Sequence, residues 1–211
     1  MTDFSIFYGK TVIVTGHTGF KGSWLALWLN KLGARVVGIS DYIPTKPSNF
    51  EVSDVTSFIL DHRIDIRNEF EIATLFDEIQ PDFVFHLAAQ ALVRSSYESP
   101  IETMSVNSLG TAVVLEALKK VKKQVVAIMI TSDKAYDNVE WVWGYREHDR
   151  LGGKDPYSAS KGMAELVIKS YFESYFSSKD SNVRIGVARA GNVIGGGDWA
   201  RDRIIPDCMK A

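Results

Sequence analysis

The sequence predicts an α/β protein with a doubly wound parallel sheet. Two observations predict it. Short, β-branched, apolar segments alternate along the chain with segments in which apolar residues recur at helical spacing, and a glycine-rich turn separates the first pair. Strands that are apolar throughout must be covered on both faces, which a parallel sheet between two layers of helices provides.

The elements can be assigned in order along the 211 residues. The pattern predicts strands at 11–15, 34–39, 83–88, 125–130 and 183–188. It predicts helices at 24–32, 69–79, about 100–120 and 156–176. Two long connections, 41–58 and 137–155, remain irregular, and connections of this length are commonly lids or binding segments.

Composition excludes several classes of protein. Apolar residues make up 45% of the chain, charged residues 24%, and 24 basic against 26 acidic residues leave a net charge of −2. The one basic cluster, 119–123, ends a predicted helix, where cations are favourable, so we expect no nucleic-acid partner. No apolar run approaches the roughly 20 residues that span a bilayer, and the amino terminus lacks a signal peptide. We therefore expect no membrane association and a cytoplasmic location.

Metal and thiol chemistry are also not expected. His62, His86 and His148 share no metal-ligand spacing, so we predict structural roles for them and no metal site. Cys208 is the only cysteine and has no histidine in a shared pattern, so we predict neither a disulfide nor a nucleophile there.

The turn after the first strand is typical of a phosphate-binding loop, and we expect Rossmann-type binding of NAD. Glycines let the backbone approach a pyrophosphate, and the amides at a helix start attract its charge. The spacing is GxxGxxG, and the residues are Gly16, His17, Thr18, Gly19, Phe20, Lys21 and Gly22. Asp41 follows the second strand, where a carboxylate would bind a ribose and repel an extra phosphate, which favours NAD over NADP. The alternative for Asp41 is an exposed loop carboxylate, and for Lys21 a solvent-facing side chain.

Two groups of residues indicate proton transfer. Tyr157 and Lys161 are four residues apart in a predicted helix and share a face, where the ammonium would favour the phenolate. Ser132, Asp133 and Lys134 follow the predicted strand 125–130, at the sheet edge where ligands bind. Ser132 could bond the hydroxyl that Tyr157 deprotonates, and an Asp-Lys pair could supply a second acid and base. A salt-bridged turn is the alternative for that pair.

At this point the chain resembles a known family, the CDP-glucose 4,6-dehydratases, within the extended short-chain dehydrogenase/reductases (the NAD-dependent epimerase/dehydratase family). The resemblance covers nearly the whole chain. It is carried by Thr-Gly-His-Thr-Gly-Phe-Lys-Gly-Ser-Trp-Leu (15–25), Ala-Ala-Gln-Ala-Leu-Val-Arg (88–94), Thr-Ser-Asp-Lys-Ala-Tyr (131–136), Trp-Val-Trp-Gly-Tyr-Arg-Glu (141–147), Asp-Pro-Tyr-Ser-Ala-Ser-Lys (155–161) and Arg-Ala-Gly-Asn-Val-Ile-Gly-Gly-Gly-Asp-Trp (189–199).

The resemblance implies an NAD-dependent lyase that makes CDP-4-keto-6-deoxyglucose for deoxysugar and surface-polysaccharide synthesis, such as lipopolysaccharide O-antigen. Tyr157, helped by Lys161 and Ser132, would deprotonate the C4 hydroxyl while NAD takes hydride. Water would then leave across C5 and C6, and hydride would return to C6. The related dTDP-glucose dehydratases use an Asp-Glu pair for the elimination. Here Asp133 would be the acid and Lys134 the base.

The resemblance also implies binding residues. Asp65 and Ile66 would lie at the adenine, and Arg189 and Asn192 near the nicotinamide or substrate. Further cofactor contacts would come from Leu87, Ala88, Ala89, Gln90, Asn107 and Thr131, besides Tyr157 and Lys161.

The family pattern continues beyond Ala211. We therefore expect residues 1–190 to form the NAD-binding domain and 191–211 to start a substrate-binding region that is mostly absent. Helices 100–120 and 156–176 would pair in a homo-oligomer. Two alternatives stay open: a cofactor-binding fragment or pseudoenzyme with little activity alone, and a UDP-N-acetylglucosamine dehydratase.

Overall fold

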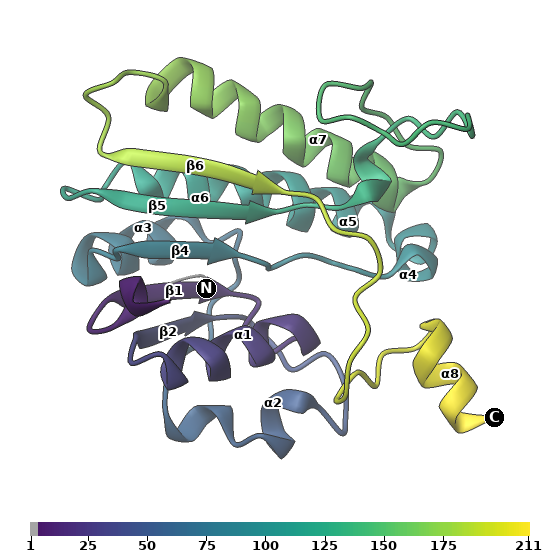
Figure 1. Cartoon of the computed structure of the whole chain (residues 1–211), viewed down its shortest axis with the longest axis horizontal. Helices are drawn as coiled ribbons and strands as arrows, with labels where there is room; N and C mark the ends of the chain where they lie inside the picture. The colour runs from purple at the N-terminus through teal and green to yellow at the C-terminus, as the bar shows by residue number, and fades with distance from the viewer. Residues whose placement is uncertain (1–3) are drawn as a thin grey trace.

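Six parallel strands form one sheet in the computed structural model, which describes residues 4–211. The strands are β1 (Thr11–Thr15), β2 (Arg35–Ile39), β3 (Leu60–His62), β4 (Phe83–His86), β5 (Val125–Ile130) and β6 (Val183–Ala188). Their order is β3-β2-β1-β4-β5-β6, and each neighbouring pair is parallel. The strand order reverses between β1 and β4, as in a doubly wound sheet. The predicted fold class is confirmed (Figure 1).

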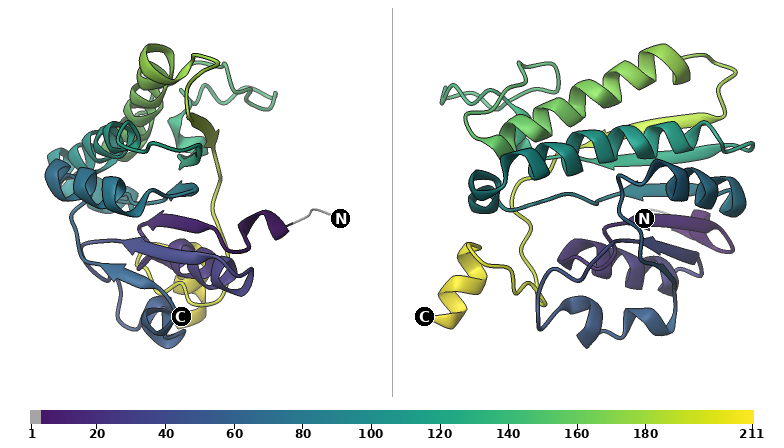
Figure 2. Two further views of the ribbon diagram at one scale, coloured as in Figure 1. Left: turned by 90° about the vertical axis from the view of Figure 1, so that its left-hand side faces the viewer. Right: turned by 180° about the vertical axis from the view of Figure 1, so that it is seen from behind.

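Helices cover both faces of this sheet (Figures 1 and 2). They are α1 (Phe20–Lys31), α2 (Asn49–Val52), α3 (Glu69–Ile79), α4 (Val93–Glu98), α5 (Pro100–Met104), α6 (Gly110–Leu118), α7 (Pro156–Tyr171) and α8 (Ile204–Lys210). A π-helical turn, Ser105–Leu109, joins α5 to α6, and another, Phe172–Phe176, continues α7. Within the described part of the chain, no helix is long and apolar enough to cross a membrane.

Each face of the sheet has its own apolar core. Helices α3, α6 and α7 pack on one face, where Ile13 of β1 is fully buried. Helix α1 and the segment 50–55 pack on the other face, where Val12 and Val14 are fully buried. Successive side chains of a strand point to opposite faces, so β1 contributes to both cores. This explains why its sequence is apolar without alternation.

Some elements differ from those that the sequence indicates. The short elements β3, α2, α4 and α8 were not expected, because three to seven residues show no clear periodicity. The predicted strand 83–88 ends at His86. Beyond it, the amides of Leu87 and Ala88 each lie 3.1 Å from Thr15 Oγ1. The predicted helix at 24–32 starts earlier, at Phe20.

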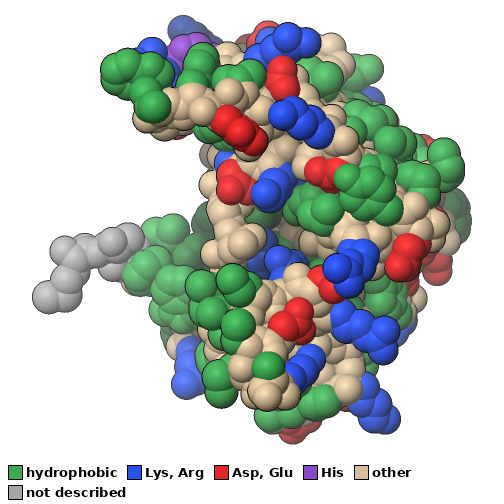
Figure 3. Space-filling view, turned by 90° about the vertical axis from the view of Figure 1, so that its right-hand side faces the viewer, with side chains coloured by type: hydrophobic (Ala, Val, Ile, Leu, Met, Phe, Trp, Pro, Cys, Tyr) green, Lys and Arg blue, Asp and Glu red, His purple; other side chains and the backbone are tan. Residues whose placement is uncertain are grey.

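The chain after β6 runs along the carboxyl ends of the strands towards α1 and ends in α8 (Figure 1). Two contacts attach it: Trp24 Nε1 donates to the Gly196 carbonyl at 2.9 Å, and Arg94 pairs with Asp202 at 2.8 Å. Figure 3 views this edge of the sheet and shows an arm with apolar side chains above a hollow. The arm is the connection 137–155.

The imidazole of His86 is buried between two hydroxyl groups. Its Nδ1 is 2.8 Å from Thr15 Oγ1, and its Nε2 is 3.1 Å from Thr111 Oγ1. Burial, together with the charge of Lys161, lowers the pKa of His86 to about 3. The side chain is therefore neutral and joins β1, β4 and α6, which is the structural role that we predicted.

We expect His86 to make the fold sensitive to acid. Its folded pKa lies below the unfolded value of about 6.5, so the unfolded state takes up the proton first as the pH falls. From about pH 6.5 down towards 3, the free energy of unfolding should fall by about 1.4 kcal/mol per pH unit. Urea denaturation at several pH values, for the parent and His86→Gln, measures this. Equal pH slopes in the two proteins would contradict it.

Candidate active site

The predicted site residues gather at the carboxyl ends of β1, β4 and β5. Parallel strands end at the same edge, and the strand order reverses between β1 and β4, which is where doubly wound sheets bind ligands. The loop after β1 approaches the segment after β4: a Cβ at Gly16 would lie 2.8 Å from the Ala88 backbone. Two predicted binding segments are thus in contact.

The phosphate loop has a backbone that only glycine fits. Gly16 has φ +72°, in the left-handed region. A Cβ on Gly22 would lie 2.1 Å from the Gly16 carbonyl oxygen and 2.7 Å from His17 Cα. This packing brings the start of α1 against the turn. The free amides of that helix start can therefore face an anion at the sheet edge.

Two side chains of this loop lie beneath it. The imidazole of His17 is fully buried, and its Nε2 is 2.8 Å from Asp61 Oδ1. Burial lowers the pKa of His17, although Asp61 opposes the shift. Thr18 Oγ1 lies 2.7 Å from both Ser40 Oγ and the Tyr42 carbonyl. These two side chains support the loop, and only their backbone remains for a ligand.

The predicted adenosine contacts follow β2 and β3. Asp41 is exposed directly after β2, and its Oδ1 accepts the Tyr42 amide at 3.0 Å. Asp65 is bound by Arg67, whose Nη2 donates to Oδ2 at 2.6 Å, and this hydrogen bond lowers the pKa of Asp65. Ile66 is buried beside Gly110. The two strands are neighbours, so these residues lie on the same side of the phosphate loop.

Asn107 organises the segment after β4. Its Oδ1 accepts the Gln90 amide at 2.8 Å, and its Nδ2 donates to the Gln90 carbonyl at 3.1 Å and to Ser160 Oγ at 2.8 Å. Asn107 lies in the π-helical turn before α6 and is buried. It therefore ties 87–90 to α7, and its side chain is already occupied by these bonds.

Tyr157 and Lys161 are both buried on α7, which begins with an N-cap bond from the Ser158 amide to Asp155 at 2.9 Å. Burial raises the pKa of Tyr157, and a hydrogen bond with Ser132 opposes the rise. Burial and the nearby charge of Lys21 lower the pKa of Lys161 to about 8. The structure thus brings together the predicted serine, tyrosine and lysine.

Asp133 and Lys134 lie on a short turn, Asp133–Ala135, that follows β5. The Asp133 amide donates to the Ala190 carbonyl at 3.1 Å, and its Oδ1 accepts Ser132 Oγ at 3.1 Å. Asp133 is near enough to Tyr157 for its charge to raise the tyrosine pKa. Both side chains are exposed, and within residues 4–211 no ion pair is found for Lys134. The salt-bridged turn that was the alternative is absent from the described residues.

Arg189, predicted to lie near the nicotinamide or substrate, is bound by protein groups. Its guanidinium is bound to Glu165 by two hydrogen bonds, of 2.7 and 2.9 Å, and donates to the Glu147 carbonyl at 2.9 Å. It also lies 4.7 Å from the centre of the Tyr136 ring. Asn192 is exposed on the strand-like segment after β6. Other groups of the protein thus bind the Arg189 guanidinium, while the Asn192 side chain is exposed to solvent.

Sequence reasoning missed Arg203 and Glu165. Burial lowers the pKa of Lys21 and the charge of Arg203 adds to this shift, while the same charge opposes the rise that burial causes in the pKa of Tyr157. Arg203 therefore reaches the site from the segment after β6. Its Nε is buried without a hydrogen-bond partner. Glu165 lies one turn after Lys161 on the same helix, and this i, i+4 spacing was a signal available in the sequence. The sequence contained no such signal for Arg203, because its proximity to the site depends on the path of the chain after β6.

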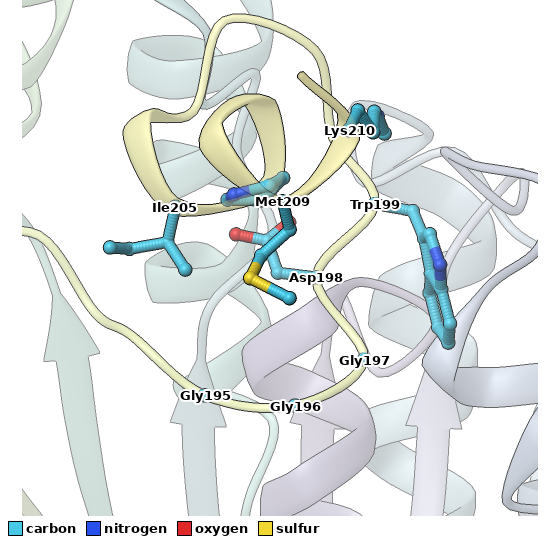
Figure 4. A pocket seen from close by; sticks show the side chains of 9 residues that line it. Gly195, Gly196, Gly197, Asp198, Trp199, Ile205, Met209 and Lys210 are labelled. Atoms are coloured by element: carbon cyan, nitrogen blue, oxygen red, sulfur yellow. The ribbon is translucent and has the colours of Figure 1, made fainter.

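Two hollows lie beside this site. An apolar hollow of about 540 Å³ separates α1 from 193–196 and has Lys21 on its rim. A hollow of about 360 Å³ lies between 195–199 and α8, as Figure 4 shows with Trp199 and Met209. In the described part of the chain, no cluster of three His, Cys, Asp or Glu side chains could hold a metal ion.

Comparison with known protein families identifies the family of this chain. A family model described as GDP-mannose 4,6 dehydratase matches residues 13–181. The chain belongs to this dehydratase family. The matched residues extend from β1 through α7, so they include the phosphate loop, the Asp133–Lys134 turn and the Tyr157–Lys161 pair.

Members and structural neighbours of the dehydratase family match most of the chain. The CDP-glucose 4,6-dehydratase of Salmonella typhimurium is 51% identical, over 100% of this chain and 60% of that protein. An epimerase of Methanothermobacter thermautotrophicus superposes with a TM-score of 0.80 at 29% identity, over 97% and 58% of the two chains. The structure of MoeE5 with UDP-glucose and NAD superposes with a TM-score of 0.75 at 26% identity, over 95% and 60%. This chain thus spans about 60% of these relatives.

Gly22→Ala should destabilise the phosphate loop. Its Cβ would meet backbone atoms of Gly16 and His17, which cannot rotate away, so we expect a loss of about 1–3 kcal/mol in the free energy of unfolding. Gly196→Ala is a matched control, because a Cβ there meets no atom within 4 Å. Urea denaturation of both variants gives the comparison. Equal stabilities would mean that the loop is not packed as described.

Proposed function

We propose that this chain carries the cofactor site and the acid-base residues of a nucleotide-sugar 4,6-dehydratase that acts on CDP-glucose. The observation that carries the proposal is the meeting of two groups of residues at one sheet edge. Ser132, Asp133 and Lys134 leave β5 beside the Tyr157 and Lys161 of α7. Hydride transfer alone needs only the second group, whereas removal of water also needs an acid and a base.

The proposed cofactor is NAD. The close approach of Gly16 to Ala88, and of Gly22 to Gly16, packs the start of α1 against the turn after β1, and the free amides of a helix start suit a pyrophosphate. Asp41 after β2 suits a ribose hydroxyl and disfavours a 2′-phosphate. The MoeE5 structure, of similar fold, contains NAD. When bound, NAD would take hydride from C4 of the sugar and return hydride to C6.

The residues of α7 would perform the first proton transfer. Tyr157 would accept the proton of the C4 hydroxyl; burial raises its pKa, and its hydrogen bond with Ser132 opposes this rise. Lys161, held one turn away, would when protonated stabilise the phenolate form of Tyr157. Because the pKa of Lys161 is about 8, most of its side chain is in the ammonium form at neutral pH. Lys21 and Arg203 add positive charge at the same edge, which suits the diphosphate of a nucleotide sugar.

The turn after β5 would perform the elimination. The ketone at C4 acidifies the hydrogen at C5, which Lys134 would remove as an amine. Asp133 would donate a proton to the C6 hydroxyl as it leaves as water, and the proton that Lys134 removed would return to C5 when C6 receives hydride.

The 51% identity to a CDP-glucose 4,6-dehydratase supports the choice of CDP-glucose over UDP-N-acetylglucosamine. We also propose the cytoplasm as its location and a domain boundary near 190, where β6 ends. A homo-oligomer through the helices from α5 to α7 is supported by exposed apolar side chains on them, namely Ile101, Leu109, Met163, Leu166 and Phe172.

Incubation of the chain with NAD and each of CDP-, dTDP-, GDP- and UDP-glucose tests the function. We expect a 4-keto-6-deoxy product, detected by its absorbance in alkali, from CDP-glucose. Product from dTDP-glucose only would overturn the assignment of CDP-glucose as the substrate. Saturable NAD binding without product from any of the four sugar nucleotides would favour a cofactor-binding fragment.

Lys134→Ala should separate the two stages of the reaction. Because Lys134 is exposed and outside any ion pair among the described residues, the variant should fold normally. We expect the first hydride transfer to persist while product formation falls by about 10²–10⁴-fold, the usual contribution of a general base. Exposed Lys154→Ala is the control. Unchanged turnover in Lys134→Ala would exclude this lysine as the base.

A further inference from the structure

Glu165 is a buried carboxylate that the proposed reaction does not use. It lies on α7 one turn after Lys161 and is only 6% exposed. Its Oε1 accepts Thr131 Oγ1 at 2.5 Å and Arg189 Nε at 2.7 Å, and its Oε2 accepts Arg189 Nη2 at 2.9 Å. One carboxylate therefore joins the ends of β5 and β6 to the helix that carries Lys161.

Arg189 extends this connection into the arm. Its guanidinium lies 4.7 Å from the Tyr136 ring centre, Tyr136 stacks on Tyr145 with centroids 5.0 Å apart and planes at 23°, and Trp141 lies 5.6 Å from Tyr145. We name the three rings of Tyr136, Tyr145 and Trp141, together with the Arg189 guanidinium that lies on Tyr136, the aromatic column. A further bond, from Arg189 Nη1 to the Glu147 carbonyl at 2.9 Å, attaches the far end of the arm.

The aromatic column starts directly after the turn Asp133–Ala135. That turn is held at both ends: the Asp133 amide bonds the Ala190 carbonyl at 3.1 Å, and the Ala135 carbonyl accepts the Gly152 amide at 3.0 Å. The segment beyond it is held by Tyr136, which forms a β-bridge with Leu151 and lies on Arg189. The turn also packs on α7, so its position depends on that helix together with groups from the arm and from the segment after β6.

We propose that Glu165 and Arg189 are positioning residues for the elimination step. Their ion pair holds the Asp133–Ala135 turn, through Tyr136, against the face of α7 that carries Tyr157. Arg189 binds Glu165 in this role and is not a ligand of the substrate. The inference rests on the proposed function and identifies two further residues that it requires.

The first hydride transfer and the elimination should depend to different degrees on the ion pair between Glu165 and Arg189. Tyr157 and Lys161 are fixed by their own helix, whose N-cap bond to Asp155 and whose contacts with α4, α5 and α6 do not involve the side chains of Tyr136, Tyr145 or Trp141. The elimination acid and base stand on a three-residue turn with few bonds of its own. A loosened ion pair should therefore slow the loss of water much more than the first hydride transfer.

Arg189→Lys and Tyr136→Leu test the positioning role without removing the buried charge. Lysine keeps the positive charge beside Glu165 but lacks the planar fork that makes two hydrogen bonds and stacks on Tyr136. Tyr136→Leu interrupts the aromatic column and leaves the ion pair intact, and Tyr136→Phe should restore the parent behaviour because the ring remains. Arg184→Lys, at an exposed position of β6, the strand that Arg189 follows, is the control.

Hydrogen–deuterium exchange measures whether the turn is held. In Arg189→Lys and Tyr136→Leu we expect amides of 133–147 to exchange about tenfold faster or more, with 16–22 unchanged. Arg184→Lys and Tyr136→Phe should match the parent. Unchanged protection of 133–147 in Arg189→Lys would overturn the proposal.

A single turnover with NAD and CDP-glucose measures the catalytic consequence. Absorbance of the reduced nicotinamide should appear within about twofold of the parent rate, while product should form about tenfold more slowly or worse. Equal slowing of both stages, or a raised KM with unchanged elimination, would overturn the positioning role. If the parent gives no product from any sugar nucleotide, the proposed function fails and the role in elimination fails with it. The exchange result still decides whether the ion pair holds the turn.

Discussion

A parallel sheet between two layers of helices must hide every strand twice, and the rest of this structure depends on that constraint. The side chains of β1 alternate between two apolar cores, with Ile13 in one and Val12 and Val14 in the other. Because all six strands point the same way, all of their carboxyl ends lie at one edge. The loops that leave this edge are free of the packing requirement, so they can carry polar and charged groups. The core thereby determines where the chemistry can take place.

Several buried polar side chains beneath this edge are satisfied by one another. His86 lies between the hydroxyls of Thr15 and Thr111, and Asn107 binds both Gln90 and Ser160. A buried polar group without a partner would cost about 1–3 kcal/mol, so these matched sets allow polar side chains inside the core. They also give the loops above them defined positions. The candidate active site is consequently supported by a layer of neutral hydrogen bonds.

Charge in the site itself is distributed differently. Lys161 is buried near Lys21, and the resulting repulsion and desolvation bring its pKa to about 8. Glu165 on the next turn of α7 opposes this shift while it holds Arg189 and Thr131. The same carboxylate therefore acts on the electrostatics of α7 and on the geometry of the strands beside it. Arg189, expected from the family resemblance to lie near the nicotinamide or substrate, has its guanidinium bound to Glu165 and to the Glu147 carbonyl.

The sequence by itself determined the local features: the apolar strands, the helices with caps and periodicity, the glycines of the phosphate loop, and the Tyr157–Lys161 spacing. Each of these features depends only on residues close together in the chain, through steric limits on the backbone or through the spacing of apolar side chains. It also indicated Asp133 and Lys134 as a candidate acid-base pair beyond what a simple oxidoreductase needs. The tertiary structure alone decided the short elements β3 and α8, the buried partners of His17 and Arg189, and the arrival of Arg203 at the site. Those depend on contacts between residues far apart in the chain, which no local pattern encodes.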